Sequence, residues 1–258
     1  NKSDYIIRKE TKNDYREVEN LNREAFWNLS VPGCSEHYFV HVMRDHKDFI
    51  PELAHVLEIG GKIVGCVMYC KGLLKDEEGN EKTILTMGPL CVHPDYQRQG
   101  IGKALLEYTF ALGRKMGYDT VINFGNPDNY VARGYKSCKK YNVCLEGDIF
   151  PAALLVKELT EGALDGRKWY YYQCDADAPC EDEEAVEKFD SQFPPKVKAW
   201  QPSQEEFYIH SHSAIHGNMI TKAVKRYSSL RLFLYSIIGL YDSALSATSS
   251  GVRSSKNM

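Results

Sequence analysis

The chain has 258 residues, of which 43% are hydrophobic and 26% charged, and its formal net charge at pH 7 is −3. The length predicts one large domain, or one domain with an appendage, and the composition is typical of a soluble globular protein. The slightly acidic balance argues against a general nucleic-acid-binding protein. The eight cysteines include no C-x-x-C pair, which predicts free thiols in a reducing, cytoplasmic compartment and no disulfide framework.

The first part of the chain predicts a short strand followed by two helices. Residues 5–8 form the apolar strand, and Thr11 with Asp14 resembles a capping box at the start of a helix that reaches about Trp27. A break over residues 28–34 separates this helix from a second one. Each helix has one apolar face that can pack against other elements.

Three apolar runs then predict the centre of a sheet. Residues 54–59 and 62–70 are joined by a Gly-Gly turn, which is typical of a hairpin. Residues 83–92 form the third run, and Pro89 inside it cannot donate a hydrogen bond to a neighbouring strand. We therefore expect this strand to be irregular or bulged at Pro89.

The third run leads into a short polar loop and then into an amphipathic segment, which predicts a strand, a turn and a helix N-terminus. Such a turn leaves backbone N–H groups unpaired, and the helix dipole adds partial positive charge. Gly100 and Gly102 let a ligand approach the backbone, and Arg98 and Lys103 add positive charge. We therefore expect a phosphate or pyrophosphate site here. Its spacing fits neither the Rossmann pattern G-x-G-x-x-G nor the P-loop pattern G-x-x-x-x-G-K-S/T.

The helix after this loop is expected to end at Gly117, and more strands follow it. Strands mixed with helices, including one strand–helix–strand unit, indicate an α/β (α+β) fold with a mixed sheet. The further strands are predicted over residues 120–124, 141–145, 152–159 and 168–172. The helix residues expected to be buried are Ala104, Leu105, Tyr108, Ala111 and Leu112.

The composition changes after Gln173, where an acidic run and several prolines begin. We therefore expect the main domain in residues 1–173 and a C-terminal extension in residues 174–258. The extension is predicted to contain an acidic linker and then a polar, basic tail. The apolar run within residues 230–247 is too short for a transmembrane span, and we expect a short amphipathic helix that docks on the domain or on a partner.

Three histidines in the extension could suggest a metal site. They have no cysteine or carboxylate partner at ligand spacing and lie in a polar segment, so we interpret them as part of a solvated tail and expect no metal. The three are His210, His212 and His216.

Residues 90–106 resemble the acetyl-CoA loop of the GNAT superfamily of N-acetyltransferases. The pattern Q/R-x-x-G-x-G/A occurs as Q-R-Q-G-I-G over residues 97–102, with Leu-x-Val-x-Pro before it and Ala-Leu-Leu after it. The resemblance covers roughly residues 5–172. Residues 31–44 and 126–135 are similar to one bacterial subgroup of mostly unassigned substrate. The departures from the subgroup pattern are Asn126, Asn129 and Arg133.

This resemblance implies a GNAT fold, in which helices flank a mixed, mostly antiparallel twisted sheet and a splayed central strand admits acetyl-CoA. It implies acetyl-CoA as co-substrate, no metal, and direct transfer of acetyl to a primary amine of a small molecule or peptide. A homodimer is left open. The residues that the resemblance implies for cofactor binding are Leu90, Cys91, Val92, Gln97, Arg98, Gln99, Gly100, Ile101, Gly102, Lys103 and Asn126.

Acyl transfer requires a base for the amine, donors to the oxyanion and a donor to the leaving thiolate. We expect the backbone N–H groups of residues 90–92 to serve the oxyanion and Tyr130 to serve the sulfur, as the matching tyrosine does in similar enzymes. The strand over residues 83–87 has no carboxylate, so the base is open. His37 and His41 lie on one helical face and could act directly or through water. The other candidates are Glu58, Glu36 and His93.

Two alternatives to acetyl transfer remain open. A CoA-binding regulatory or interaction module without turnover is favoured by the missing strand carboxylate and by the atypical extension. An acyltransferase for longer acyl chains would prefer larger thioesters.

Overall fold

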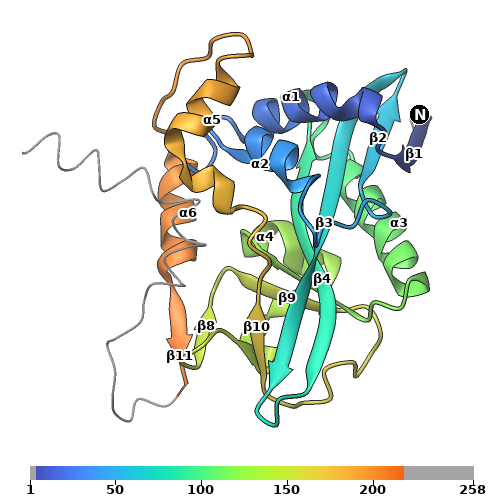
Figure 1. Cartoon of the computed structure of the whole chain (residues 1–258), viewed down its shortest axis with the longest axis vertical. Coiled ribbons are helices and arrows are strands. Elements are labelled where there is room, and N and C mark those ends of the chain that lie inside the picture. Colours follow the sequence, from blue (N-terminus) through green and yellow to red (C-terminus); the bar gives the residue numbers. More distant parts are fainter. Residues whose placement is uncertain (1–3, 218–258) are drawn as a thin grey trace, which may run out of the picture.

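Figure 1 shows the computed structural model of the protein, in which residues 4–217 are described. In this part, nine strands form one mixed sheet in the order β1-β2-β3-β4-β5-β9-β6, and β10 pairs with β3 and β7. β8 and β11 form a separate two-stranded sheet. The strands are β1 (Tyr5–Lys9), β2 (His55–Ile59), β3 (Lys62–Asp76), β4 (Glu81–Val92), β5 (Thr120–Phe124), β6 (Lys136–Ser137), β7 (Val143–Cys144), β8 (Ile149–Pro151), β9 (Leu154–Glu158), β10 (Trp169–Tyr172) and β11 (Ala214–His216).

Helices lie on both faces of this sheet, because alternate residues of β2 and β3 are apolar on both sides. On one face, α1 and α2 pack on Val56, Cys66 and Met68. On the other face, α3 packs on Leu57 and Val67. The α-helices are α1 (Tyr15–Phe26), α2 (Glu36–Met43), α3 (Ile101–Lys115), α4 (Pro127–Tyr130), α5 (Glu183–Asp190) and α6 (Pro202–His212).

The predicted start of the first helix is confirmed. Thr11 N donates to Asp14 Oδ2 at 2.7 Å, and α1 follows a short 3-10 turn over Lys12–Asp14. Asp14 also accepts hydrogen bonds from the Arg8 guanidinium. The capping carboxylate therefore joins the helix N-terminus to β1.

The buried face predicted for α3 is only partly right. Leu105 is fully buried as expected, whereas Tyr108 is 46% exposed. The buried face of α3 is rotated from the predicted one because the Ile101 side chain enters the core beside Gly65. A Cβ atom on Gly65 would lie 2.8 Å from Ile101 Cγ2. A small residue on β3 thus decides which side of α3 is buried. The buried residues of α3 are Ile101, Leu105, Leu106, Thr109, Phe110 and Gly113.

β4 is the strand that opens the sheet. It pairs with β3 along its length, but it pairs with β5 only at Leu85↔Val121 and Thr86↔Ile122. The β3–β4 register shifts where Gly88 and Pro89 face the single residue Met68, so the bulge predicted at Pro89 is confirmed. Beyond Thr86, the edge of β4 that faces β5 has no strand partner in the described part of the chain.

Part of the expected extension folds back onto the helix pair, as Figure 1 shows for α5 beside α1 and α2. Arg23 of α1 is 1% exposed, and its Nε lies 2.6 Å from Asp190 Oδ1 of α5. Phe189 and Phe193 are buried next to this pair. The boundary expected at Gln173 stays a prediction.

No helix within residues 4–217 is both long enough and apolar enough to span a membrane. The helix predicted over residues 230–247 lies outside the described residues.

Candidate active site

The glycine loop after β4 forms the N-terminus of α3, as predicted. Gly100 is the N-cap residue and has φ 86°, a left-handed conformation that glycine adopts without a Cβ clash. Ala104 N donates to Gly100 O at 2.9 Å, so this bond is the first of the helix, and the N–H groups before it have no intrahelical acceptor. These N–H groups and the helix dipole make an exposed site for a phosphate.

Some side chains of the glycine loop hydrogen-bond to its backbone, and others are exposed cations. Gln97 Nε2 donates to Val92 O at 3.2 Å and Gln99 Nε2 donates to Asp95 O at 3.3 Å, so both amides hold the loop in shape. Arg98 and Lys103 are exposed, and Lys103 lies 3.6 Å from Glu107. Both cations can therefore reach an anion in solvent.

Ile101 and Gly102 can contribute only backbone groups to the predicted cofactor contacts. The Ile101 side chain is 5% exposed and belongs to the core. A Cβ at Gly102 would meet only Val92 Cγ2, at 3.8 Å. The space beside Gly102 is therefore open to a ligand.

The open edge of β4 presents two of the three N–H groups predicted to bind the thioester. His93 N donates to Val64 O of β3 at 2.8 Å. Since backbone direction alternates along a strand, Leu90 and Val92 turn their N–H groups toward β5, where β4 has no pairing partner. Cys91 N–H points to β3 by the same rule, and the Cys91 side chain is buried 3.4 Å from Cys66 Sγ. The cofactor contact predicted for Cys91 is therefore not supported.

A cavity of about 190 Å³ lies beside this open edge. It is mostly apolar and collects side chains from α1, α2, the bulge of β4, α4 and the segment after β10. Its walls are Phe26, Ser35, Glu36, Phe39, Met43, Cys70, Thr86, Met87, Gly88, Pro89, Leu90, Phe124, Tyr130, Gln173, Cys174, Ala176, Asp177 and Cys180.

Tyr130 reaches the cavity from α4, as the sequence predicted for a residue beyond a strand end. Its ring packs edge-on against Tyr135, with ring centroids 5.5 Å apart. Burial raises the pKa of Tyr130 to about 12, so the phenol keeps its proton at neutral pH. A phenol in this state can donate a proton or a hydrogen bond.

Glu36 is one of the carboxylates that the fold brings to the cavity, together with Asp177. Glu36 occupies the first turn of α2, and Ser35 N donates to Glu36 Oε2 at 3.1 Å. Burial raises the pKa of Glu36 to about 7, where the side chain can accept a proton near neutral pH. The sequence named Glu36 only among several candidates.

His37 and His41 lie on the other side of α2 and do not appear among the described cavity walls. His37 is fully buried, with Nε2 2.9 Å from Asp190 Oδ1, and burial lowers its pKa to about 4. His41 Nδ1 lies 2.9 Å from Glu19 Oε1. These positions do not support a base role for either residue, because the helical face that they share turns toward α5.

The remaining candidates also lie elsewhere. Glu58 pairs with Arg8 of β1, and His93 Nδ1 accepts a hydrogen bond from Asp95 N at 3.3 Å within the loop. Asn126 caps α4, since its Oδ1 accepts from Asp128 N at 3.0 Å. The base role of Glu58 is therefore not supported, and the cofactor contact of Asn126 stays a prediction.

Several cavity residues were missed by the sequence analysis. They come from β3, from β4 and from the segment after β10, where no local pattern marks them. Only the long-range pairing of β10 with β3 places that segment at the cavity. The missed polar residues are Cys70, Thr86, Gln173, Cys174, Asp177 and Cys180.

Comparison with known proteins gives the same fold. Residues 23–136 match the model of the Acetyltransferase (GNAT) family. A GNAT family N-acetyltransferase (YhbS) from Escherichia coli, solved in complex with CoA, superposes with a TM-score of 0.58 at 22% identity and covers 67% of this chain and 91% of its own. A GNAT family acetyltransferase from Brucella melitensis, solved with acetyl-CoA, gives 0.53 at 22% identity, with 67% and 98% coverage. The predicted fold is therefore confirmed.

The uncharacterized N-acetyltransferase YjhQ of Escherichia coli (strain K12) is 30% identical over 88 residues, which is 34% of this chain. The aligned region spans about half of that relative, 48% of its length. The match over residues 23–136, which is less than half of the chain, and the two superpositions show that this chain has the GNAT fold.

Proposed function

We propose that this chain binds acetyl-CoA at the Gly100 loop and transfers the acetyl group directly to a primary amine held in the cavity. The observation that carries the proposal is that Leu90, Tyr130 and Glu36 meet at one cavity beside the open edge of β4. The two solved relatives bind CoA and acetyl-CoA, according to their descriptions, which supports the same cofactor here.

The loop and the strand edge suit the two ends of this cofactor. The N–H groups at the start of α3, with Arg98 and Lys103, suit the pyrophosphate. The N–H groups of Leu90 and Val92 suit the pantetheine arm and the thioester carbonyl, because they face the gap between β4 and β5. Bound acetyl-CoA supplies an activated acetyl group.

Glu36 and Tyr130 divide the proton transfers between them. Glu36 accepts the proton of the incoming ammonium, which its raised pKa permits near pH 7. Tyr130 keeps its proton and donates it, or a hydrogen bond, to the sulfur that leaves. Leu90 N–H stabilises the charge that develops on the carbonyl oxygen.

The cavity favours an acceptor with an apolar body next to its amine. Phe26, Phe39, Met87 and Phe124 line it, and Glu36 is a carboxylate placed where an ammonium would be attracted. An apolar primary amine or a peptide with an apolar residue beside its amine fits this lining. A polyanionic acceptor does not.

The direct test is release of CoA from acetyl-CoA in the presence of a panel of amines. The panel pairs each apolar amine with a polar amine of similar size, so that the lining is tested together with the reaction. Turnover with the apolar members and saturable acetyl-CoA binding is the expected result. If acetyl-CoA neither binds nor shifts the melting temperature, the proposed function is wrong.

The same experiment separates the alternatives left open by the sequence. Saturable binding without CoA release over the whole panel would indicate a binding module. Faster turnover with larger thioesters would indicate a longer acyl group.

A further inference from the structure

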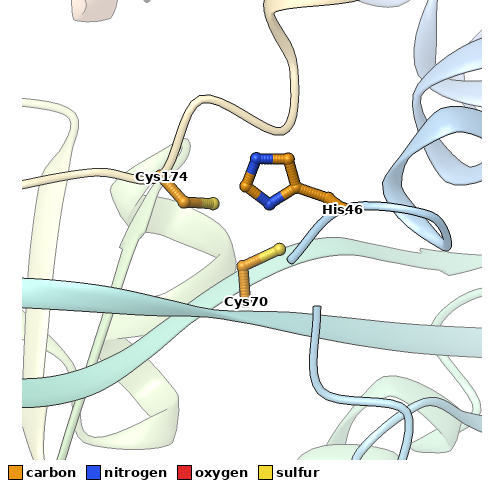
Figure 2. A group of neighbouring side chains, drawn as sticks. All are labelled: His46, Cys70 and Cys174. Carbon is orange, nitrogen blue, oxygen red and sulfur yellow. The ribbon is translucent and has the colours of Figure 1, made fainter. Parts of the chain in front are cut away.

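A cluster of potential metal ligands lies at one wall of the cavity, and the proposed acetyl transfer does not use it. The side chains of His46, Cys70 and Cys174 offer one nitrogen and two sulfur atoms that all lie within 4.8 Å of one another. Figure 2 shows the three side chains converging from separate parts of the chain. We propose that these residues bind one Zn²⁺ ion.

The ligand set suits zinc in both chemistry and size. Thiolate and imidazole are the ligands that Zn²⁺ prefers, and two thiolates neutralise its charge in this half-buried place. Tetrahedral zinc with Zn–S near 2.3 Å and Zn–N near 2.0 Å separates neighbouring ligand atoms by about 3.5 to 3.8 Å. The separations between ligand atoms therefore need to shrink by at most about 1.3 Å for the cluster to close around the ion.

The sheet brings the two cysteines together. Cys70 belongs to β3, and β10 runs antiparallel to it with Tyr172 opposite Leu73. The pairing ends at Tyr172, and two residues further along the chain Cys174 lies in the cluster with Cys70. Strand pairing therefore brings the segment after β10 close to β3, although more than a hundred residues separate the two cysteines in the sequence.

The loop that carries His46 is fixed to the same strand. Lys71 N donates to Asp48 O at 2.8 Å, and Ile50 N donates to Tyr69 O at 3.0 Å. These bonds lie on both sides of Cys70 in β3. His46 is thus held at the cluster by backbone hydrogen bonds rather than by its own side chain alone.

The contact between His46 and Asp175 directs the other ring nitrogen, Nδ1, to the cluster, and the ion would take the place of the Asp48 N–H group that now donates to Nδ1. Nε2 lies 3.0 Å from Asp175 Oδ1, and Nδ1 accepts a hydrogen bond of 3.2 Å from Asp48 N. Both contacts agree with the tautomer that carries its proton on Nε2 and a lone pair on Nδ1. Figure 2 shows Nδ1 turned toward the Cys70 sulfur. A carboxylate on the far ring nitrogen is the usual arrangement around a histidine ligand, and it orients the ring.

The proposed ion would have three protein ligands and one position open to the cavity. Cys70 and Cys174 both line the cavity wall, so the fourth position can take water or an acceptor group. The ion would also tie the segment after β10 to β3 and to the loop of His46. Its presence would shape the acceptor side without taking part in cofactor binding.

Metal binding to the full chain tests the site independently of acetyl transfer. The protein is reduced, freed of metal with a chelator and titrated with Zn²⁺ against a chromophoric chelator, and then with Co²⁺. We expect one ion per chain and the thiolate-to-cobalt charge-transfer and strong d–d bands of a tetrahedral cobalt site. Absence of stoichiometric Zn²⁺ binding by the reduced protein would overturn the proposal.

Variants locate the ion at the three ligands. Cys70→Ser and Cys174→Ser should each weaken Zn²⁺ binding by at least about 100-fold. Cys180→Ser is the matched control, because Cys180 lines the same cavity outside the cluster, and it should bind zinc normally. Equal binding by Cys70→Ser and Cys180→Ser would contradict the assignment.

Asp175→Asn tests the zinc site with a variant whose effect on zinc affinity would not come from misfolding. Asp175 has a side chain that is 79% exposed, so its replacement leaves the fold intact. It should still weaken zinc binding by about 10- to 100-fold, because it removes the carboxylate that orients His46. Unchanged affinity in this variant would argue against His46 as a ligand.

Discussion

The ring of Tyr130 occupies space that only the missing side chain of Gly125 leaves free. A Cβ atom at Gly125 would lie 2.5 Å from Tyr130 Cε2. Tyr135 supports the ring from another side, so its position in the cavity wall is set by packing. The phenol that we assign to the leaving sulfur is therefore held in place before any ligand binds.

Loss of the Tyr130 hydroxyl should reduce turnover and leave cofactor binding intact. Tyr130→Phe keeps the packing and removes the proton donor, so we expect kcat to fall by about 100-fold with little change in the Kd for acetyl-CoA. Gly125→Ala should lower kcat as well, because it displaces the ring. Steady-state CoA release and calorimetric acetyl-CoA binding measure the two quantities. Tyr108→Phe, at an exposed site of α3, is the control, and unchanged kcat in Tyr130→Phe would make Tyr130 a packing residue.

The pH dependence of the reaction should report Glu36. Only the ionised carboxylate accepts a proton, so kcat/KM should rise with pH through about 7 and then level off. Glu36→Gln should lower kcat/KM by about 100-fold and remove this rise. The profile of Glu107→Gln, an exposed change on α3, should match that of the wild type. If His41→Gln removes the rise instead, the base is His41 and the assignment of Glu36 is wrong.

Glu36 should also make folding stability depend on pH. Its folded pKa of about 7 lies above the ordinary value of 4.5, so the folded state holds this proton more tightly than the unfolded chain. Its contribution to stability is full below about pH 4.5 and is lost as pH rises through about 7. At pH 8, Glu36→Gln should therefore be more stable than the wild type by about 1 to 3 kcal/mol. Denaturant unfolding at pH 5 and pH 8 measures this, and an equal difference at both values would contradict it.

A carboxylate in the glycine loop should abolish cofactor binding. Gly100→Asp places negative charge where phosphate is expected, and we predict that the affinity for acetyl-CoA falls by at least about 100-fold. Gly117→Asp is a matched control at the other end of α3, because Gly117 has φ 93° and equal space for a side chain. Both variants carry similar backbone strain. Comparable affinity in the two would show that the loop does not hold the phosphates.

The contact between Arg23 and Asp190 should contribute strongly to stability. Asp190→Ala leaves the buried guanidinium without its carboxylate and should lower the free energy of unfolding by about 2 to 4 kcal/mol. Glu107→Ala removes an exposed partner of Lys103 and should cost less than about 0.5 kcal/mol. Urea unfolding compares them. Equal small losses would mean that α5 adds little to the stability of the preceding residues, as a separate extension would.

The sequence predicted structural features correctly where each feature depends on residues that are close together in the chain. The capping box of Thr11 and Asp14, the bulge at Pro89 and the loop at Gly100 each depend on neighbouring residues, and the structure has all three. The prediction of the buried face of α3 was only partly right, because this face depends on Gly65, thirty-six residues before the helix begins. Periodicity finds a helix more reliably than it finds the side that is buried.

The prediction of the general base was limited for the same reason, since local sequence does not show which side chains face the cavity. His37 and His41 were attractive because imidazoles titrate near neutral pH and share a helical face. Glu36 is their neighbour in sequence, but one residue turns the side chain by about 100° around the helix, and this difference carries it to the cavity. Only the packing of α2 between β4 and α5 decided which of these side chains reaches the cavity.

The sequence by itself determined the fold and the position of the glycine loop, because a strand, a glycine turn and a helix N-terminus form a continuous segment. The tertiary structure alone decided what surrounds the acceptor. The cavity joins α2, the bulge of β4 and the segment after β10, and long-range strand pairing brings these together. The meeting of His46, Cys70 and Cys174 has the same origin, since their separation in sequence leaves no local pattern to mark it.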